Sequence, residues 1–316
     1  MSRAIRGAVG GLGAVAALGV GALAYGMLIE RTAFTVRRER LAILPAGSRP
    51  LRILHLSDLH MAPWQSAKQR FVASLALLEP DLVVDTGDDL GHRDGLVGIR
   101  RAYAPFRGVP GVFVHGSNDR FGPVWKNPVA YLARPSDHRV EAEHLDTEAL
   151  DRFLADDLGW WSLENAARAV ELRGHRIEFF GTADAHRGWD DLPRLATEIE
   201  RMREAVEWSP RTDAPALAIG VTHAPYRRVL DALTAEGADL LIAGHTHGGQ
   251  VRVPGFPALV ANCDLPRRQA QGVSAWRTGR RRATLEVSAG LGTSIYAPVR
   301  FGCRPEAVVL DLVPAP

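Results

Sequence analysis

The sequence contains little cysteine and almost no excess of charge of either sign. Only two of the 316 residues are cysteines, Cys263 and Cys303, which argues against a metal site made of thiolates alone. The two thiols could form one disulfide in an oxidising compartment or remain separate in the core. The formal net charge is +2, so the overall charge gives no electrostatic basis for nucleic-acid binding. The chain also lacks internal repeats and, beyond its N-terminal apolar run, low-complexity tracts.

Charged residues are absent from one long stretch, residues 7–29. At about 1.5 Å per helical residue, this stretch is long enough to cross a hydrocarbon layer of about 30 Å. Arg3 and Arg6 precede it, as in a signal peptide, but it exceeds the apolar core of about 7–15 residues that such peptides have. We therefore predict an uncleaved membrane anchor over residues 1–30, in preference to a cleaved signal peptide or a buried helix of a soluble protein.

The rest of the chain has the composition of a globular protein, since 46% of all residues are apolar and 23% are charged. We predict a stem over residues 31–50 and one domain over residues 51–316. Arginines on both sides of the anchor compete for the cytoplasmic side, and a simple count favours a cytoplasmic domain. Large domains after a short N-terminal tail are often exported despite such a bias, so we expect an extracytoplasmic domain. The arginines that follow the anchor are Arg31, Arg37, Arg38 and Arg40.

Apolar strand-like runs alternate with amphipathic helical segments, which indicates an α/β fold with parallel strands. Strands are expected over 51–56, 82–84, 112–114, 176–181, 216–221, 240–243, 285–287 and 307–312, with a further strand-like piece within 160–172. Helices are expected over 66–79, 94–104, 147–157, 190–206 and 226–235. Three prolines interrupt residues 120–146, which we interpret as a long loop or lid that contains Trp125 and Tyr131.

Polar residues follow five of the apolar strands at the point where each strand ends. In open α/β sheets the ligand crevice lies outside the carboxyl ends of the strands, so these side chains should converge there. Each residue alone has an ordinary explanation, as a helix cap, a turn former or a hydrogen-bonded loop histidine. Their repetition at five strand ends favours a shared site. The candidate metal ligands are Asp58, His60, Asp88, Asn118, His223, His245 and His247.

Two carboxylates, four imidazoles and one amide form a mixed nitrogen and oxygen donor set. This set suits Mn, Fe or Zn better than Ca or Mg. Seven donors are too many for one tetrahedral ion but suit two divalent ions about 3.5–4 Å apart with a bridging carboxylate. Such a pair of ions binds phosphate and generates a hydroxide nucleophile at neutral pH.

The order of these motifs resembles that of the calcineurin-like metallophosphoesterase superfamily. The matching motifs are Asp58-x-His60, Gly87-Asp88, Gly116-x-Asn118-Asp119, His223 and Gly244-His245-x-His247. The anchor, the run Gly244–Gln250 and the late segment Ser288–Gly292 resemble its YkuE-like branch of membrane-anchored bacterial members.

This resemblance implies a four-layer α/β/β/α sandwich with a two-metal site. It implies that Asp88 bridges the two ions. It also implies that one ion is held by Asp58, His60 and His247, and the other by His223 and His245.

The third motif departs from the superfamily pattern Gly-Asn-His-Asp, in which the histidine assists the leaving group. In register, Ser117 occupies the ligand position and Asn118 replaces the histidine. With a shift of one residue, Asn118 is the ligand, and we prefer this because an amide oxygen suits a hard cation better than a neutral hydroxyl does. In both cases the usual general acid, a group that contributes typically about 10²–10⁴-fold, is missing. Other histidines that could substitute for it are His92, His115 and His186, the last in an Asp184-x-His186 loop that could line the site.

The leading hypothesis is a membrane-anchored phosphoesterase that hydrolyses a phosphomonoester or phosphodiester, with Asn118 and His223 also taking part in catalysis. Anchoring through residues 7–29 favours a lipid- or envelope-linked substrate, and the 120–146 segment would contribute to substrate choice. The alternative is a metal-binding membrane scaffold or sensor that has lost catalysis, and the altered third motif favours it. A soluble phosphoprotein phosphatase leaves residues 7–29 unexplained.

Overall fold

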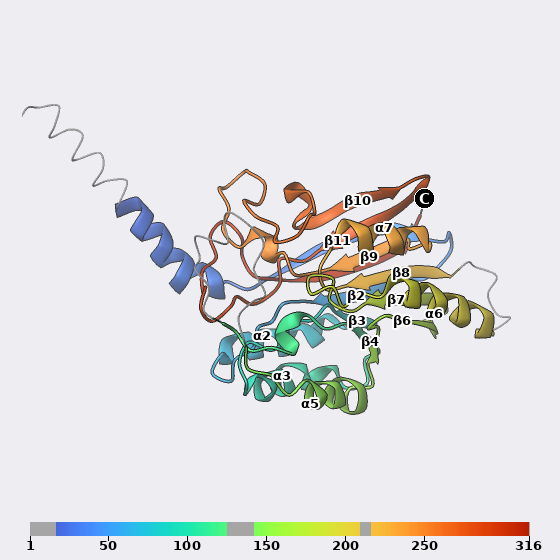
Figure 1. Ribbon diagram of the computed structural model, residues 1–316, viewed down its shortest axis with the longest axis horizontal. Helices are drawn as coiled ribbons and strands as arrows, with labels where there is room; N and C mark the ends of the chain where they lie inside the picture. Colours follow the sequence, from blue (N-terminus) through green and yellow to red (C-terminus); the bar gives the residue numbers. More distant parts are fainter. Residues whose placement is uncertain (1–16, 125–141, 209–215, 316) are drawn as a thin grey trace, which may run out of the picture.

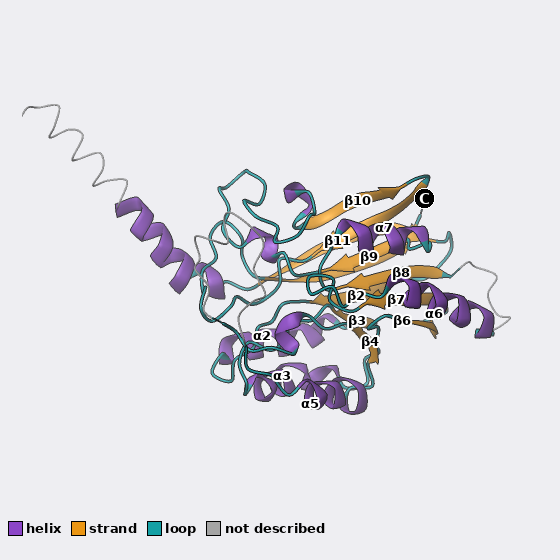
Figure 2. Ribbon diagram, viewed as in Figure 1, coloured by secondary structure: helices purple, strands orange, loops and turns teal. Residues whose placement is uncertain are grey.

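Two six-stranded sheets lie face to face, with helices on both outer faces (Figures 1 and 2). The computed structural model describes residues 17–124, 142–208 and 216–315. The first sheet has the strand order β1-β12-β2-β3-β4-β5. Its strands are β1 (Thr35–Leu44), β12 (Glu306–Pro314), β2 (Leu51–Leu56), β3 (Leu82–Asp85), β4 (Gly111–Phe113) and β5 (Trp161–Ser162).

The second sheet has the order β10-β11-β9-β8-β7-β6. Its strands are β10 (Gly272–Thr278), β11 (Arg281–Val287), β9 (Leu240–Ala243), β8 (Leu217–Thr222), β7 (His175–Thr182) and β6 (Ala166–Leu172). Most neighbours are parallel, while β12 with β2, β10 with β11 and β6 with β7 are antiparallel. Both sheets are therefore mixed but rich in parallel pairs, as the strand–helix alternation predicts.

Three large apolar clusters separate the four layers, and a small fourth cluster consists of Ala258, Ala261 and Ala270. On β2, Leu51 and Ile53 belong to the cluster between the sheets, whereas Leu54 and Leu56 belong to the cluster under the helices. This follows from the alternation of side chains along a strand, which supplies both faces of a buried sheet from one apolar run. The first sheet is covered by α2 (Ser66–Ser74), α3 (Gly95–Tyr103) and α5 (Thr147–Arg152), and the second by α6 (Leu192–Ala205) and α7 (Arg227–Ala235).

The segment that we expected to be a stem is part of the first sheet. Its central residues form β1, which pairs in parallel with β12 from Thr35 opposite Glu306 to Leu44 opposite Pro314. The prediction was wrong because four consecutive charged residues, 37–40, hide the strand pattern. One of these charged residues, Arg37, is partly buried in the domain, where it forms ion pairs with Glu286 and Glu306.

The N-terminal apolar stretch is described from residue 17 onward, where a helix runs to residue 28 and points away from the domain (Figure 1). Its large apolar side chains are exposed, for example Leu18 and Leu28 at 74% and 73%. Across the described ranges, no helix has the length and apolar character needed to cross a membrane. Residues 7–16 of the predicted anchor lie outside those ranges.

Two other expectations concern the loop at 120–146 and the cysteines. Residues 125–141, with Trp125 and Tyr131, lie outside the described residues, so a role as a lid stays a prediction. The described ends of this loop meet in an antiparallel bridge between Phe121 and His144. Cys263 and Cys303 are free thiols, and Cys303 is buried.

Candidate metal centre

The predicted ligands follow the carboxyl ends of five strands, β2, β3, β4, β8 and β9. Five of them have a positive φ, between 41° and 66°, which costs free energy for any residue with a side chain. Strain of this kind persists only where the surrounding structure imposes it, and it is concentrated at functional sites. These five residues are Asp58, His60, Asp88, His245 and His247.

Two glycines permit the close approach of these loops. A Cβ atom on Gly244 would lie 1.9 Å from Ser57 Oγ and 2.6 Å from Asp58 Oδ2. A Cβ on Gly116 would lie 2.1 Å from Asp88 Oδ1. The glycines of the third and fifth motifs are therefore required by packing against the carboxylates.

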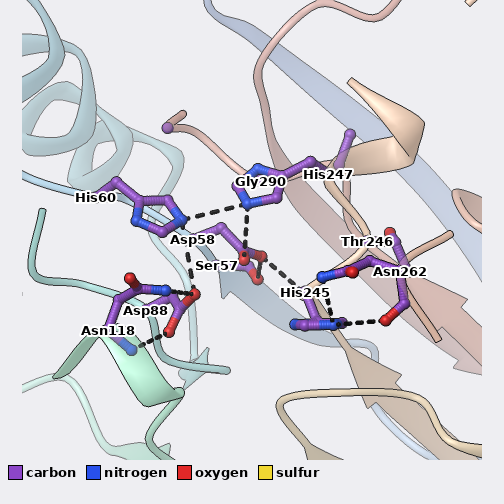
Figure 3. Close-up of polar contacts among 12 residues, drawn as sticks. Ser57, Asp58, His60, Asp88, Asn118, His245, Thr246, His247, Asn262 and Gly290 are labelled. Carbon is purple, nitrogen blue, oxygen red and sulfur yellow. Dashed lines mark hydrogen bonds and ion pairs between the residues drawn. The ribbon is translucent and has the colours of Figure 1, made fainter. Parts of the chain in front are cut away.

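The first group of donors consists of Asp58, His60 and His247, which could hold one ion. The two histidines face each other with 3.2 Å between their Nε2 atoms, and His247 Nε2 lies 3.5 Å from Asp58 Oδ1 (Figure 3). All three side chains are largely buried, so their donor atoms converge in a small space shielded from water.

The two carboxylate oxygens of Asp58 have different surroundings. Oδ2 accepts hydrogen bonds from the Ser57 hydroxyl and from the backbone N–H of His245, the latter at 2.9 Å. Oδ1 is buried and has no hydrogen-bond partner among the residues that the structure describes. An unsatisfied buried acceptor costs about 1–3 kcal/mol, and more when it is charged. The oxygen that faces His247 is thus the one left open for a cation.

A chain of buried side chains holds Asp58 from behind, between the two sheets. Glu286 Oε1 and Oε2 contact Arg37 Nη2 at 2.6 Å and His55 Nδ1 at 2.5 Å. His55 Nε2 lies 2.9 Å from the Thr86 hydroxyl, which in turn lies 2.7 Å from the Ser57 hydroxyl. The β1 strand that sequence reasoning missed is therefore connected to the candidate ligand Asp58.

The second group of donors consists of Asp58, Asp88 and His223. Asp88 Oδ2 lies 3.7 Å from His223 Nε2 and 3.6 Å from His60 Nε2, so this single oxygen faces both groups. The Nδ1 atom of His223 lies 2.8 Å from the Thr86 carbonyl oxygen, which fixes Nδ1 as a donor and turns Nε2 toward Asp88.

The remaining predicted ligands, His245 and Asn118, border the second group. His245 Nδ1 lies 3.2 Å from His223 Nε2, while its Nε2 faces Asn262. The backbone N–H and the side-chain amide of Asn118 donate to Asp88 at 2.8 and 2.6 Å. All seven predicted residues thus come together, although His245 and Asn118 are not members of either group.

Burial and mutual charge shift the pKa values in opposite directions across the site. Burial lowers the pKa of His245 to about 3 and that of His247 well below its usual range, so both imidazoles are neutral with available lone pairs. Burial would raise the pKa of Asp58, but the neighbouring His247, His223 and His60 hold it below its usual range. Burial would also lower the pKa of His223, and Asp88, Asp184 and Asp58 instead raise it to about 9. At this pKa the His223 ring is protonated at neutral pH, so a divalent metal would have to displace its Nε2 proton. The ionised Asp58 and the neutral His245 and His247 already offer donor atoms that suit a divalent transition metal.

Asp119 organises the Asp88 loop, a role that sequence reasoning did not assign. Its carboxylate accepts backbone hydrogen bonds from Asp88 and Asp89 at 2.7 Å each, from Gly116 at 2.9 Å and from Leu90 at 3.1 Å. The only sequence signal was its position beside Asn118 in the third motif.

The three histidines considered as substitutes for the missing general acid lie in different places. The ring of His186 lies 4.5 Å from that of His245, and its Nδ1 lies 3.0 Å from the Tyr226 hydroxyl. His115 instead contacts Asp151 at 2.6 Å, and His92 pairs with Asp94 at 3.5 Å. Of the three, His186 contacts a predicted ligand.

Asp184 lies close to the second group. It is fully buried, and burial raises its pKa to about 6. Its Oδ2 atom has no hydrogen-bond partner within the described part of the chain. The Asp184-x-His186 loop therefore borders the site.

A profile of the calcineurin-like phosphoesterase family matches residues 51–249, which include all seven predicted ligands and more than half of the chain. The chain belongs to this family. The superfamily prediction is confirmed, and this membership supports a phosphoester hydrolase. Members of the family use divalent metals, and the described residues include two groups that could hold such ions.

Three relatives extend this family assignment. The chain is 27% identical over 293 residues to "Phosphodiesterase YaeI" of Escherichia coli, covering 89% of this chain and 88% of the relative. It is 23% identical over 323 residues to "Uncharacterized metallophosphoesterase YkuE" of Bacillus subtilis, covering 98% and 96%. It is 28% identical over 282 residues to "Transmembrane protein with metallophosphoesterase domain" of Bos taurus, covering 86% of this chain and 55% of the relative.

Proposed function

We propose that this protein hydrolyses a phosphodiester or phosphomonoester at a centre of two divalent ions, Mn, Fe or Zn. The observation that carries the proposal is the position of Asp88 Oδ2, within 3.7 Å of a histidine Nε2 atom in each donor group. The unsatisfied Asp58 Oδ1 supports it, because that buried oxygen needs a cation. Bound as a pair, the two ions would supply a hydroxide nucleophile at neutral pH and offset charge on the phosphoryl oxygens.

In this proposal the side chains divide the work between the two ions. Asp58, His60 and His247 would hold the first ion, and Asp88 would be shared by both ions. His223, His245 and Asn118 would hold the second, with the Asn118 amide turned so that its oxygen replaces the nitrogen that now faces Asp88. The bond from His223 Nδ1 to the Thr86 carbonyl holds the ring in position, and Nε2 would bind the ion after losing its proton.

The leaving group is proposed to lie on the side of the second ion. Here a cavity of about 550 Å³ is lined by Arg120, Phe121, Asn165, Trp189 and Arg194, among others. Arg120 directly follows Asn118 and Asp119 in the chain, and Trp189 follows the Asp184-x-His186 loop. The arginines favour an anionic or polar group on the departing alcohol. His186 and Tyr226 are the side chains placed to donate hydrogen bonds to its oxygen.

We further propose that residues 7–29 anchor the enzyme in a membrane, with the domain on the extracytoplasmic side and a lipid- or envelope-linked phosphoester as substrate. The uncharged sequence of this stretch and the exposed apolar side chains of residues 18–29 support the anchor.

The second candidate function, a metal-binding scaffold without catalysis, is favoured by one observation. The histidine of the third motif is absent, and the position is taken by Asn118, which contacts Asp88. The donor set is otherwise complete, and this completeness supports the enzyme over the scaffold.

The test is hydrolysis of bis-p-nitrophenyl phosphate and p-nitrophenyl phosphate by the full chain in detergent, metal-free and with Mn²⁺. Asp88→Asn and His245→Ala should each abolish metal-dependent turnover. Asp157→Asn is the matched control, since this partly exposed aspartate pairs only with surface arginines in the described structure. Two bound ions per chain without turnover on either ester would favour the scaffold, and the absence of metal binding would refute both functions.

A further inference from the structure

Arg300 lies directly behind the first donor group. It is fully buried, and its Nη2 atom lies 2.7 Å from the carbonyl oxygens of Ala289 and Gly292, 3.1 Å from that of Gly290 and 3.3 Å from His247 Nδ1. The two N–H groups of this guanidinium nitrogen lie among three backbone carbonyl acceptors, which hold the side chain in one position beside His247.

The loop that Arg300 binds lies against Asp58. The backbone N–H of Leu291 donates to the Ser57 carbonyl at 3.0 Å, and that of Gly292 donates to the Asp58 carbonyl at 2.6 Å. A Cβ atom on Gly290 would lie 2.6 Å from Asp58 Cβ (Figure 3). Arg300 therefore touches one candidate ligand, His247, and holds the loop that packs on another, Asp58.

The segment that carries Arg300 is itself held by the base of the N-terminal helix. The carboxylate of Glu30 accepts hydrogen bonds from the backbone N–H groups of Gly302 at 3.0 Å and Cys303 at 2.7 Å. Glu30 is only 4% exposed, although it directly follows the apolar stretch. The backbone N–H of Arg300 donates to the Gly26 carbonyl at 3.2 Å. The rings of Tyr25 and Phe301 lie edge to face, with 6.3 Å between their centroids.

Gly26 is the position at which the helix approaches this segment. A Cβ atom there would lie 2.7 Å from the Arg300 carbonyl oxygen and 3.1 Å from a Val299 methyl group. At Gly19 and Gly21, on the same helix, a Cβ would meet no described atom within 4 Å. An anchor that only crossed a membrane would not need glycine at residue 26, so this position reports a packing contact with the domain.

We propose that residues 26–30 and Arg300 form a positioning unit for the metal centre, which we call the helix-base clamp. The clamp joins the N-terminal helix to the Ala289–Gly292 loop and to His247. The first ion site is then fully formed only when the helix base is docked, so a fragment beginning at residue 31 would have a weakened site even though it retains every predicted ligand. The ion sites belong to the proposed function, whereas the docking of the loop does not depend on it.

The experiment compares Gly26→Val with Gly21→Val in the full chain in detergent. Removal of groups that orient ligands typically costs about 10–100-fold in metal affinity, and we expect a loss in this range for Mn²⁺ in Gly26→Val. Gly21→Val should bind Mn²⁺ as the unaltered protein does, because its new side chain meets open space. Equal affinities in the two variants would overturn the proposal.

Two further variants keep the test independent of folding and of catalysis. Glu30→Gln retains the size of the side chain but weakens it as an acceptor for the N–H groups of Gly302 and Cys303. Arg300→Lys retains the charge but cannot donate to all the carbonyl oxygens of the Ala289–Gly292 loop that Arg300 contacts. Both variants should bind Mn²⁺ more weakly than the unaltered protein. If Arg300→Lys bound Mn²⁺ as tightly as the unaltered protein, the charge alone would matter and the clamp would be refuted.

Hydrogen exchange of the metal-free proteins separates this proposal from the proposed function. The peptide containing Ala289–Gly292 should exchange faster in Gly26→Val than in Gly21→Val, while the β8 and β9 amides stay protected. If no variant binds metal but this difference appears, the clamp stands and the proposed metal function fails. If the peptide exchanges alike in both variants, the clamp is refuted.

Discussion

The two halves of the candidate metal centre are built differently. The half formed by Asp58, His60 and His247 is held from behind by Ser57, the Ala289–Gly292 loop and Arg300. The half formed around His223 borders an unsatisfied Asp184 oxygen and the altered third motif, and their chain neighbours Ala183 and Arg120 line a cavity. The first half is therefore suited to fix one ion in place. The second half is where this chain departs from its family, and there substrate and leaving group would be selected.

The largest effect should come from the carboxylate that faces both donor groups. Asp88→Asn removes the charge that both ions would share, and should lower metal affinity by more than the roughly 100-fold upper range for a supporting residue. His223→Ala should instead leave one ion bound. Calorimetry with Mn²⁺ gives both stoichiometries. If Asp88→Asn retained one tightly bound ion, the two halves would not share this carboxylate.

Rebuilding the family pattern in the second half should have the next largest effect. The double change of Ser117→Asn and Asn118→His restores Gly-Asn-His-Asp, so that the amide ligand moves to position 117 and an imidazole takes position 118. It should raise turnover of an alkyl phosphodiester about 100-fold, the lower end of the range for general acid catalysis. Turnover of bis-p-nitrophenyl phosphate should change little, because p-nitrophenol leaves without protonation. If the double variant hydrolysed the alkyl phosphodiester no faster than the unaltered protein does, the missing histidine would not be what limits the enzyme.

A smaller effect is expected from the side chains that border the second half. His186→Asn or Tyr226→Phe removes a donor beside the proposed leaving-group position. Each should lower kcat/KM for an alkyl phosphodiester about 10-fold, which is less than a full general acid contributes. His92→Asn is the control, because His92 pairs with Asp94 and lies against Trp64. Equal losses in His92→Asn and His186→Asn would remove His186 from the site.

The smallest effect concerns stability, through the loop that supports Asp88. Burial would lower the pKa of His115, but Asp119 and Asp151 raise it from 6.5 to about 10. The protonated His115 ring therefore stabilises the folded state. This contribution is complete below pH 6.5, the usual pKa of histidine, and is lost as the pH rises to about 10. The difference in free energy of unfolding between the unaltered protein and His115→Gln should shrink over this interval. A constant difference in urea denaturation would contradict the assignment.

The parts of the fold that could be predicted are those with local, periodic signals. The apolar runs at β2, β3, β8 and β9 predicted buried strands, and the polar residues after them predicted a site at their carboxyl ends. β1 escaped prediction because its charged run hides the strand, and the partners of Arg37 that explain a charge at this place, Glu286 and Glu306, lie 249 and 269 residues away in the sequence. No local pattern reveals such partners.

The sequence by itself predicted which side chains would come together, because the carboxyl ends of parallel strands place them on one side of the sheets regardless of their distance in the chain. Only the tertiary structure decided how the centre is held. Contacts between loops that are distant in the chain leave Asp58 Oδ1 without a hydrogen-bond partner in the described structure and place His186 against His245. Such contacts also bury Arg300 and Glu30. The residue types indicate a metal site, but the packing between distant segments decides which donor atoms remain available to bind an ion.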